Sequence, residues 1–123
     1  MIEFFVSGKP VPQGSMKVFN GRPIHQNAVG LATWRADIAR TARIAGCQPK
    51  SAPVWIYLVF NMQAPKSVSR AMPTVKPDLD KLIRGVLDGL TGVAYEDDSQ
   101  VVRITAAKVY DKNLGVQIGV QYL

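Results

Sequence analysis

The 123-residue sequence contains a single cysteine, a single histidine and no apolar run of the roughly 18 residues that a membrane span needs. One cysteine, Cys47, excludes an internal disulfide and a cysteine-rich zinc site, and we expect its thiol to be inert. Any Ser-His or Cys-His nucleophilic scheme would depend on His25, whose loop-like surroundings favour a structural or surface role. The opening segment carries Glu3 where a secretory signal has a basic region. These absences predict a soluble cytoplasmic domain with no membrane partner.

Acidic residues are scarce and unevenly placed. The chain has nine Asp and Glu against fifteen Lys and Arg, a net charge of +6, which favours polyanionic partners such as nucleic acid. Six of the nine acids fall between positions 78 and 98, where only two bases occur, so this segment carries −4 and the rest of the chain +10. A basic body around one acidic spot suits metal-dependent phosphodiester chemistry. An acidic helix and turn on a basic surface would give the same charges.

The hydrophobic pattern predicts an α+β fold. The chain is 47% apolar, enough for a core of its own, and we expect residues 1–123 to form a single domain. Its predicted architecture is a mixed sheet of four to six strands with two packed helices. Apolar spacing predicts the helices at 31–45 and 80–91, with Asp80 as the N-cap of the second helix and Gly92 as its stop.

Alternating or continuous apolar residues predict the strands of this sheet. The unbroken run at 54–60 predicts a central strand that is covered on both faces. The last two strands are expected to form an antiparallel hairpin around the turn at 111–115, and residues 63–76 form a polar linker. The complete set of expected strands is 2–6, 54–60, 101–110 and 116–122, with a small hairpin of 17–19 and 22–24 around Asn20-Gly21.

The carboxylates are the strongest candidates for chemistry. Asp78 and Asp80 share one side if the chain is extended there, whereas Glu96-Asp97-Asp98 follows the predicted helix, which is roughly 16 Å long. The two acidic groups therefore meet only if the strand at 101–110 starts beside Asp78. Two such charges about 4 Å apart repel by about 4 kcal/mol at an effective dielectric of 20, so convergence would imply a bound cation, Mg²⁺ or Mn²⁺. Otherwise Asp80 is a helix cap, Asp78 belongs to a turn, and residues 96–98 form a solvated loop.

Three segments occur in a fixed order: Lys76-Pro77-Asp78-Leu79-Asp80-Lys81-Leu82-Ile83-Arg84, Leu87-Asp88-Gly89-Leu90-Thr91-Gly92 and Tyr95-Glu96-Asp97-Asp98-Ser99-Gln100-Val101. Together they closely resemble the RusA family of Holliday junction resolvases. The basic opening at 8–17 also looks like that of many members. The family consists of small dimeric, Mg²⁺-dependent endonucleases, often carried by phages and prophages, so the resemblance implies a bacterial or phage-encoded protein.

The resemblance also implies the roles of individual residues. The family's catalytic carboxylates fall on Asp78, Asp80 and Asp98, which would bind Mg²⁺, with Mn²⁺ as a substitute. Arg84 occupies the position of the family's catalytic lysine, and Lys81 occupies a position at which the family commonly has asparagine. Either Arg84 or Lys81 then supplies the catalytic positive charge.

The resulting hypothesis is a structure-selective endonuclease that resolves four-way DNA junctions by paired nicks in recombination and repair. A homodimer would supply the two sites. The alternatives are a junction-binding protein that does not cut and a Mg²⁺-dependent hydrolase of small phosphate esters. Candidates for contacts with the DNA backbone are seven of the thirteen basic residues outside the acidic segment: Lys9, Lys17, Arg35, Arg43, Lys66, Arg70 and Lys76.

Overall fold

The apolar run after Pro53 forms β4 (Val54–Met62), the strand around which the main sheet is built. We describe a computed structural model that covers residues 1–14, 16–19, 22–25 and 28–123. β4 pairs in parallel with β5 (Val101–Tyr110) and antiparallel with β6 (Gly115–Tyr122). β1 (Ile2–Ser7) pairs antiparallel with β6, which gives the order β1-β6-β4-β5. The sheet is therefore mixed, as predicted.

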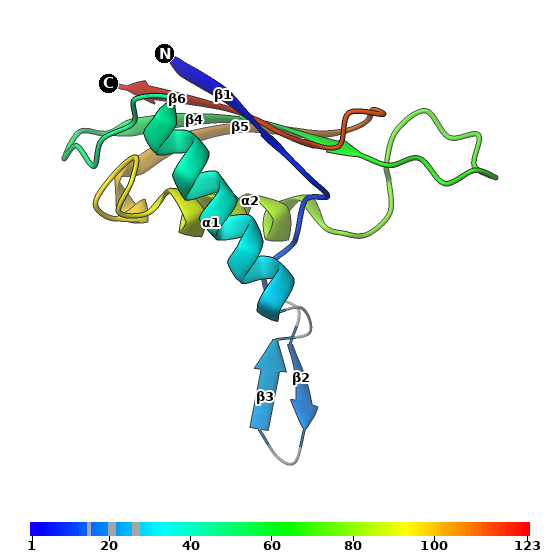
Figure 1. Cartoon of the computed structure of the whole chain (residues 1–123). Coiled ribbons are helices and arrows are strands. Elements are labelled where there is room, and N and C mark those ends of the chain that lie inside the picture. The colour runs from blue at the N-terminus through cyan, green and yellow to red at the C-terminus, as the bar shows by residue number, and fades with distance from the viewer. Residues whose placement is uncertain (15, 20–21, 26–27) are drawn as a thin grey trace.

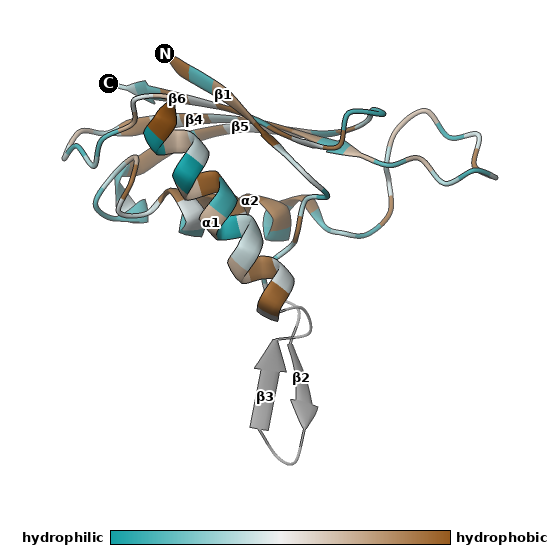
Figure 2. Cartoon of the chain, viewed as in Figure 1, coloured by the Kyte–Doolittle hydropathy of each residue, from teal (hydrophilic) through white to brown (hydrophobic). Residues whose placement is uncertain are grey.

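Two helices, α1 (Ala28–Ile44) and α2 (Leu79–Leu90), lie on the same face of this sheet (Figure 1). Their buried side chains and alternate residues of β4, such as Ile56 and Phe60, form one core. Segments of α1 alternate between hydrophobic and hydrophilic colours in Figure 2, as expected for a helix with one buried face. Two helices on a four-stranded mixed sheet confirm the α+β prediction. None of the described helices is long and apolar enough to cross a membrane.

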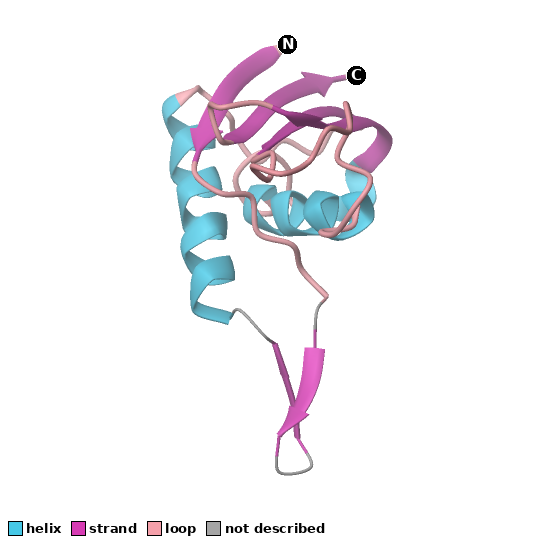
Figure 3. Cartoon of the chain, turned by 90° about the vertical axis from the view of Figure 1, so that its right-hand side faces the viewer, coloured by secondary structure: helices cyan, strands magenta, loops and turns pink. Residues whose placement is uncertain are grey.

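The expectation that the central strand is covered on both faces is wrong. β4 alternates between buried residues on the helix side and partly exposed residues on the other, where Val59 is 38% exposed. Both helices cover the same side, and no other helix among the described residues covers the opposite face (Figures 1 and 3). Trp55 and Tyr57 on that open face contact each other, with ring centroids 4.4 Å apart. A continuous apolar run here reflects an aromatic outer face rather than a second buried one.

The expected hairpin of the last two strands is also wrong. β5 and β6 run in opposite directions, but β4 lies between them. The physical reason is burial: β4 carries five fully or nearly buried apolar side chains and takes an interior position, whereas much of β5 is exposed. The turn at 111–114 therefore crosses the end of β4, where the Asp111 amide donates to the carbonyl of Met62 over 3.1 Å.

The small hairpin is confirmed. β2 (Met16–Phe19) and β3 (Arg22–His25) form a separate two-stranded sheet that extends away from the rest of the molecule (Figures 1 and 3). Asn20-Gly21, the predicted turn between them, lies outside the described residues. Lys17 and His25 fall on these two strands, where Lys17 pairs with Ile24.

The ends of α2 set the geometry of the acidic segment. Its N-cap is Asp78, in an extended conformation with φ −69° and ψ 141° and without a side-chain cap bond. The expectation that Asp80 is the cap is thus wrong, because the helix begins one residue earlier and places Asp80 in the first turn. The helix ends as predicted: Gly92 has a φ of 81°, a conformation that glycine adopts most readily.

Candidate functional site

The N-terminus of α2 gathers two carboxylates and an ammonium group. Asp78 is 48% exposed, and its Oδ2 lies 3.8 Å from Nζ of Lys81, one helical turn later. Asp80 is also exposed, in the first turn. The positive end of the helix dipole favours negative charge at this place. Two solvent-accessible carboxylates two positions apart in sequence provide oxygen ligands of the kind that Mg²⁺ and Mn²⁺ prefer.

The loop after β1 packs directly against α2 beside these residues. The amide of Gln13 donates to the carbonyl of Lys81 over 3.0 Å. A Cβ at Gly85 would lie only 2.9 Å from the carbonyl oxygen of Val11, so the two backbones approach as closely as glycine allows. A Cβ at Gly14 would lie 3.8 Å from Nη1 of Arg84. The basic opening of the sequence is therefore folded onto the acidic segment.

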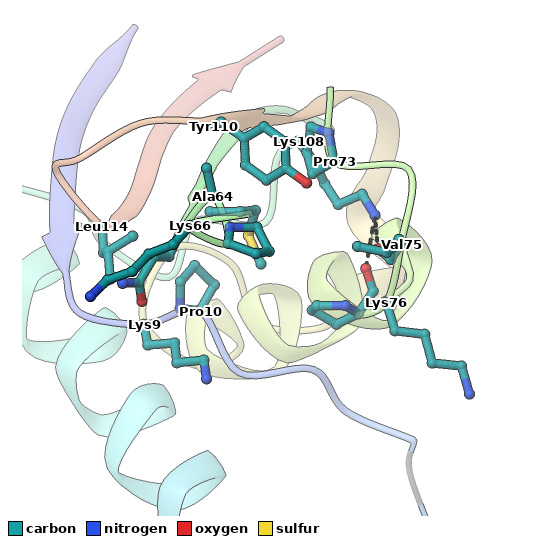
Figure 4. A pocket seen from close by; sticks show the side chains of 14 residues that line it. Lys9, Pro10, Ala64, Lys66, Pro73, Val75, Lys76, Lys108, Tyr110 and Leu114 are labelled. Atoms are coloured by element: carbon teal, nitrogen blue, oxygen red, sulfur yellow. Dashed lines mark hydrogen bonds between the residues drawn. The ribbon is translucent and has the colours of Figure 1, made fainter. Parts of the chain in front are cut away.

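Two adjoining cavities lie next to Asp78, and lysines line both of them. The larger, about 560 Å³, is bordered by Asp78 together with Lys9, Lys76 and Lys81. The second, about 340 Å³, shares Lys9 and Lys76 with the first and adds Lys66 and Lys108 (Figure 4). Such a cluster of ammonium groups beside exposed carboxylates fits a polyanionic ligand that a cation can bridge to the protein.

Lys108 is the residue of this site that the sequence analysis missed. It lies on β5 opposite Phe60, and its Nζ donates to the carbonyls of Val75 and Pro77 over 2.9 Å each (Figure 4). These bonds hold the segment before Asp78 against the C-terminal half of β5. The available signal was the spacing of Lys108, which falls on the same side of the strand as Ile104 and Ala106. A half-buried ammonium group at such a position needs nearby acceptors.

Asp98 lies at the other end of α2. Lys108, close to the end of β5, contacts Pro77, while Asp98 begins η1 (Asp98–Gln100), directly before the start of β5. From Val101 to Lys108 the strand rises about 23 Å, and the twelve residues of α2 span about 18 Å. The two acidic groups therefore do not meet within one chain, because the end of β5, not its start, lies beside Asp78. Among the described residues no three Asp, Glu, His or Cys side chains gather closely enough to hold a metal ion.

The segment that carries Asp98 is held in a fixed turn. Asp97 caps η1 by accepting from the Ser99 amide over 2.9 Å, and this hydrogen bond lowers the pKa of its carboxyl group. The side chain of Gln100 donates to the carbonyls of Lys50 and Ala52 over 2.7 and 2.9 Å. Asp98 itself is exposed. Its carboxylate is thus solvated but carried by an ordered turn.

The buried face of this turn is anchored by Tyr95. Its hydroxyl donates to the carbonyl of Leu87 over 2.6 Å. Burial raises the pKa of the phenol, and the nearby negative charges of Asp98 and Asp88 raise this pKa further. Tyr95 therefore remains a neutral hydrogen-bond donor that ties the turn to the last turns of α2.

The predicted DNA-backbone contacts other than Lys17, whose side chain lies outside the described part of the structure, separate into two groups. Lys9, Lys66 and Lys76 are exposed and line the cavities near Asp78, and Arg70 is exposed in the same linker, where its Nε donates to the Tyr110 hydroxyl over 3.0 Å. Arg43 is exposed in the last turn of α1. These side chains are available to a ligand.

Arg35 differs from the other candidates because its guanidinium group is used inside the chain. Its Nη2 donates to Asp88 of α2 over 3.1 Å and also to the side chain of Gln13. The pair is about one-third exposed. Arg35 thus joins α1, α2 and the loop after β1, which is a structural role.

Two comparisons bear on this site. The sequence profile described as Endodeoxyribonuclease RusA matches residues 7–121, a range that contains every candidate site residue. The uncharacterized protein YqaN of Bacillus subtilis (strain 168) is 30% identical over 134 aligned positions, which cover 95% of this chain and 93% of that protein.

Proposed function

The chain belongs to the RusA family of endodeoxyribonucleases, and on this basis we propose that it is a Mg²⁺-dependent, structure-selective endonuclease that resolves four-way DNA junctions by paired nicks. The observation that carries this proposal is the placement of Asp78 and Asp80 at the start of α2, beside cavities lined by Lys9, Lys76 and Lys81. Carboxylates for a cation and lysines for phosphates lie within one site.

Each group has a distinct role in this proposal. Asp78, Asp80 and Asp98 would hold the metal, which would supply an activated water and charge stabilisation for the leaving oxygen. Arg84 or Lys81 neutralises charge that develops on the scissile phosphate. The lysines that line the cavities bind the phosphates on either side and position the backbone without reading its sequence.

The separation of Asp98 from Asp78 supports a homodimer. One chain offers only two of the three carboxylates at the start of α2, so the third must come from a second copy if all three act together. A two-fold dimer then contains two complete sites, each built from both chains. Two sites related by a two-fold axis match the two strands of a four-way junction that paired nicks require.

Incubation with a labelled four-way junction and a matched linear duplex, with and without Mg²⁺, tests the activity. We expect Mg²⁺-dependent cleavage of the junction and little cleavage of the duplex. Junction binding without cleavage would instead identify a junction-binding protein, and hydrolysis of p-nitrophenyl phosphate in place of DNA would identify a small-ester hydrolase. Either result contradicts the proposal.

Mixing two inactive variants tests the shared site. We expect Asp80→Asn and Asp98→Asn each to lose cleavage by at least about a hundredfold while binding the junction, and Asp111→Asn, on an exposed turn, to cut normally. A heterodimer of the two inactive chains has one site with both carboxylates intact, so refolding them together should restore nicking of one strand. If each chain carried a whole site, the mixture would stay inactive.

A further inference from the structure

The loop between β4 and α2 presents a methionine to solvent. Residues 63–77 carry three Lys and Arg but no Asp or Glu, and the loop extends beyond the end of the sheet (Figure 1). Met72 is 69% exposed, and Val75 is 46% exposed. Single exposed apolar residues are common on protein surfaces, so the significance of Met72 depends on how the loop holds it.

This loop is tied to the end of β5 on both sides of Met72. Before it, Nε of Arg70 donates to the hydroxyl of Tyr110 over 3.0 Å. After it, Pro73 is buried and lines the smaller cavity together with Tyr110 and Lys108 (Figure 4). A ligand that contacts Met72 therefore meets a backbone that is already held in place, which reduces the conformational entropy lost on binding.

One of these anchors also holds the start of the candidate site. Nζ of Lys108 donates to the carbonyls of both Val75 and Pro77, and Asp78 follows Pro77 directly. Met72 lies six positions before Asp78, a distance of at most about 21 Å even in a fully extended chain. Met72 and the carboxylate of Asp78 therefore face the same region of a bound ligand.

Positive charges accompany the exposed methionine. Arg70 is exposed two positions before Met72, and Lys66 and Lys76 line the cavity that Pro73 helps to form. A ligand that fits this surface offers negative charge beside flat apolar area. DNA has both, since its phosphates flank stacked bases, and the proposed function places phosphates at these same lysines.

We propose that Met72 enters the base stack at the branch point of a four-way junction as an apolar wedge, while Lys66 and Lys76 hold the phosphates beside it. Apolar side chains, methionine among them, act in this way in proteins that kink DNA, at the cost of unstacking a base step. Base pairs at a branch point, where strands change partners, open more easily than those of a continuous duplex. The wedge therefore favours branched over linear DNA without reading its sequence. The identity of this ligand rests on the proposed function, to which the wedge adds a source of structure selectivity.

A four-way junction with 2-aminopurine at the branch point tests the wedge, because the fluorescence of this base rises when it unstacks. With Ca²⁺ in place of Mg²⁺ to prevent cleavage, binding of the full wild-type chain should raise the fluorescence. Met72→Ala should abolish this rise and lower the affinity for the junction by about tenfold or more, as expected when a buried methionine side chain is truncated. Its affinity for a linear duplex should not change. Met72→Leu, which keeps the apolar volume, should restore both the rise and the affinity.

Ile44→Ala is the matched control, since Ile44 is 79% exposed at the end of α1 and lines neither cavity, and it should behave as the wild type. If Met72→Ala raises the fluorescence as the wild type does, or weakens duplex and junction binding equally, the wedge is wrong and the nuclease proposal stands. If the wild type unstacks the branch point but does not cut the junction with Mg²⁺, the nuclease proposal is wrong and the wedge stands. If Met72→Ala weakens binding to phosphatidylserine vesicles but not to the junction, Met72 contacts membranes instead, and the wedge is again wrong.

Discussion

Replacing Lys9 and Lys76 together by alanine should weaken DNA binding in a salt-dependent way. Both lysines are exposed and line the two cavities beside Asp78. Substitutions at exposed positions away from caps and packing usually change the stability of the fold by less than about 0.5 kcal/mol. The double variant should therefore stay folded, and its defect should lie in binding alone.

The size of the effect follows from the release of counterions. Each phosphate neutralised on duplex DNA contributes about −0.9 to the slope of log affinity against log salt concentration. If each lysine contacts one phosphate, the double variant should flatten the slope by about 1.8. Between 50 and 200 mM salt, the advantage of the wild type over the variant should then shrink about twelvefold.

Fluorescence anisotropy with a labelled four-way junction over this salt range measures the slope, with Ca²⁺ in place of Mg²⁺ to prevent cleavage. Arg35→Ala is the matched control, since it also removes positive charge but from a guanidinium group bound to Asp88 and Gln13. It should leave the slope unchanged and cost about 1 kcal/mol of stability or less, because the ion pair is partly exposed. A flatter slope in the control, or an unchanged slope in the double variant, would refute the assignment of the lysine-lined cavities as the DNA site.

Two further predictions concern α2. Arg84→Ala should reduce the single-turnover cleavage rate of bound junction by about a hundredfold to a thousandfold, as for other lost transition-state donors. If Lys81→Ala reduces this rate instead, Lys81 is the catalytic cation. If neither variant reduces it, both assignments are wrong. Gly85→Ala should lower the thermal midpoint and the junction affinity, because the new Cβ displaces the backbone at Val11, whereas Gly89→Ala, which crowds α1 instead, should lower only the midpoint. Equal affinities for the two glycine variants would contradict a role of the loop after β1 in binding.

Local patterns were sufficient to predict most elements of this fold. The spacing of apolar residues placed both helices, since each helix buries one stripe against the sheet. Strand order was not predictable in the same way. The turn at 111–115 has the composition of a hairpin turn, but the choice of neighbour for β6 is decided by the burial that β4 gains between two strands, which no short segment encodes.

The site shows the same division between local and long-range information. The adjacency of Asp78, Asp80 and Lys81 is a local property of an extended residue that leads into a helix, and the sequence contains it. The partners of Lys108 are thirty-one and thirty-three residues away, and those of Arg35 lie in two other segments. Such contacts depend on packing, so the sequence showed neither the bonds of Lys108 to the segment before Asp78 nor the ion pair of Arg35 with Asp88.

β5 connects both halves of the proposed site, and this constrains how the protein works. Its last residues hold the segment before Asp78 through Lys108, and its first residue follows the turn that carries Asp98. A rigid strand cannot bring its own two ends together, so in the proposed homodimer the turn that carries Asp98 reaches the start of α2 from the second copy. In the proposed dimer, one pairing event therefore completes both sites at once. A single chain would hold DNA through its lysines without a complete set of carboxylates, so cutting would be confined to the form that can make both nicks.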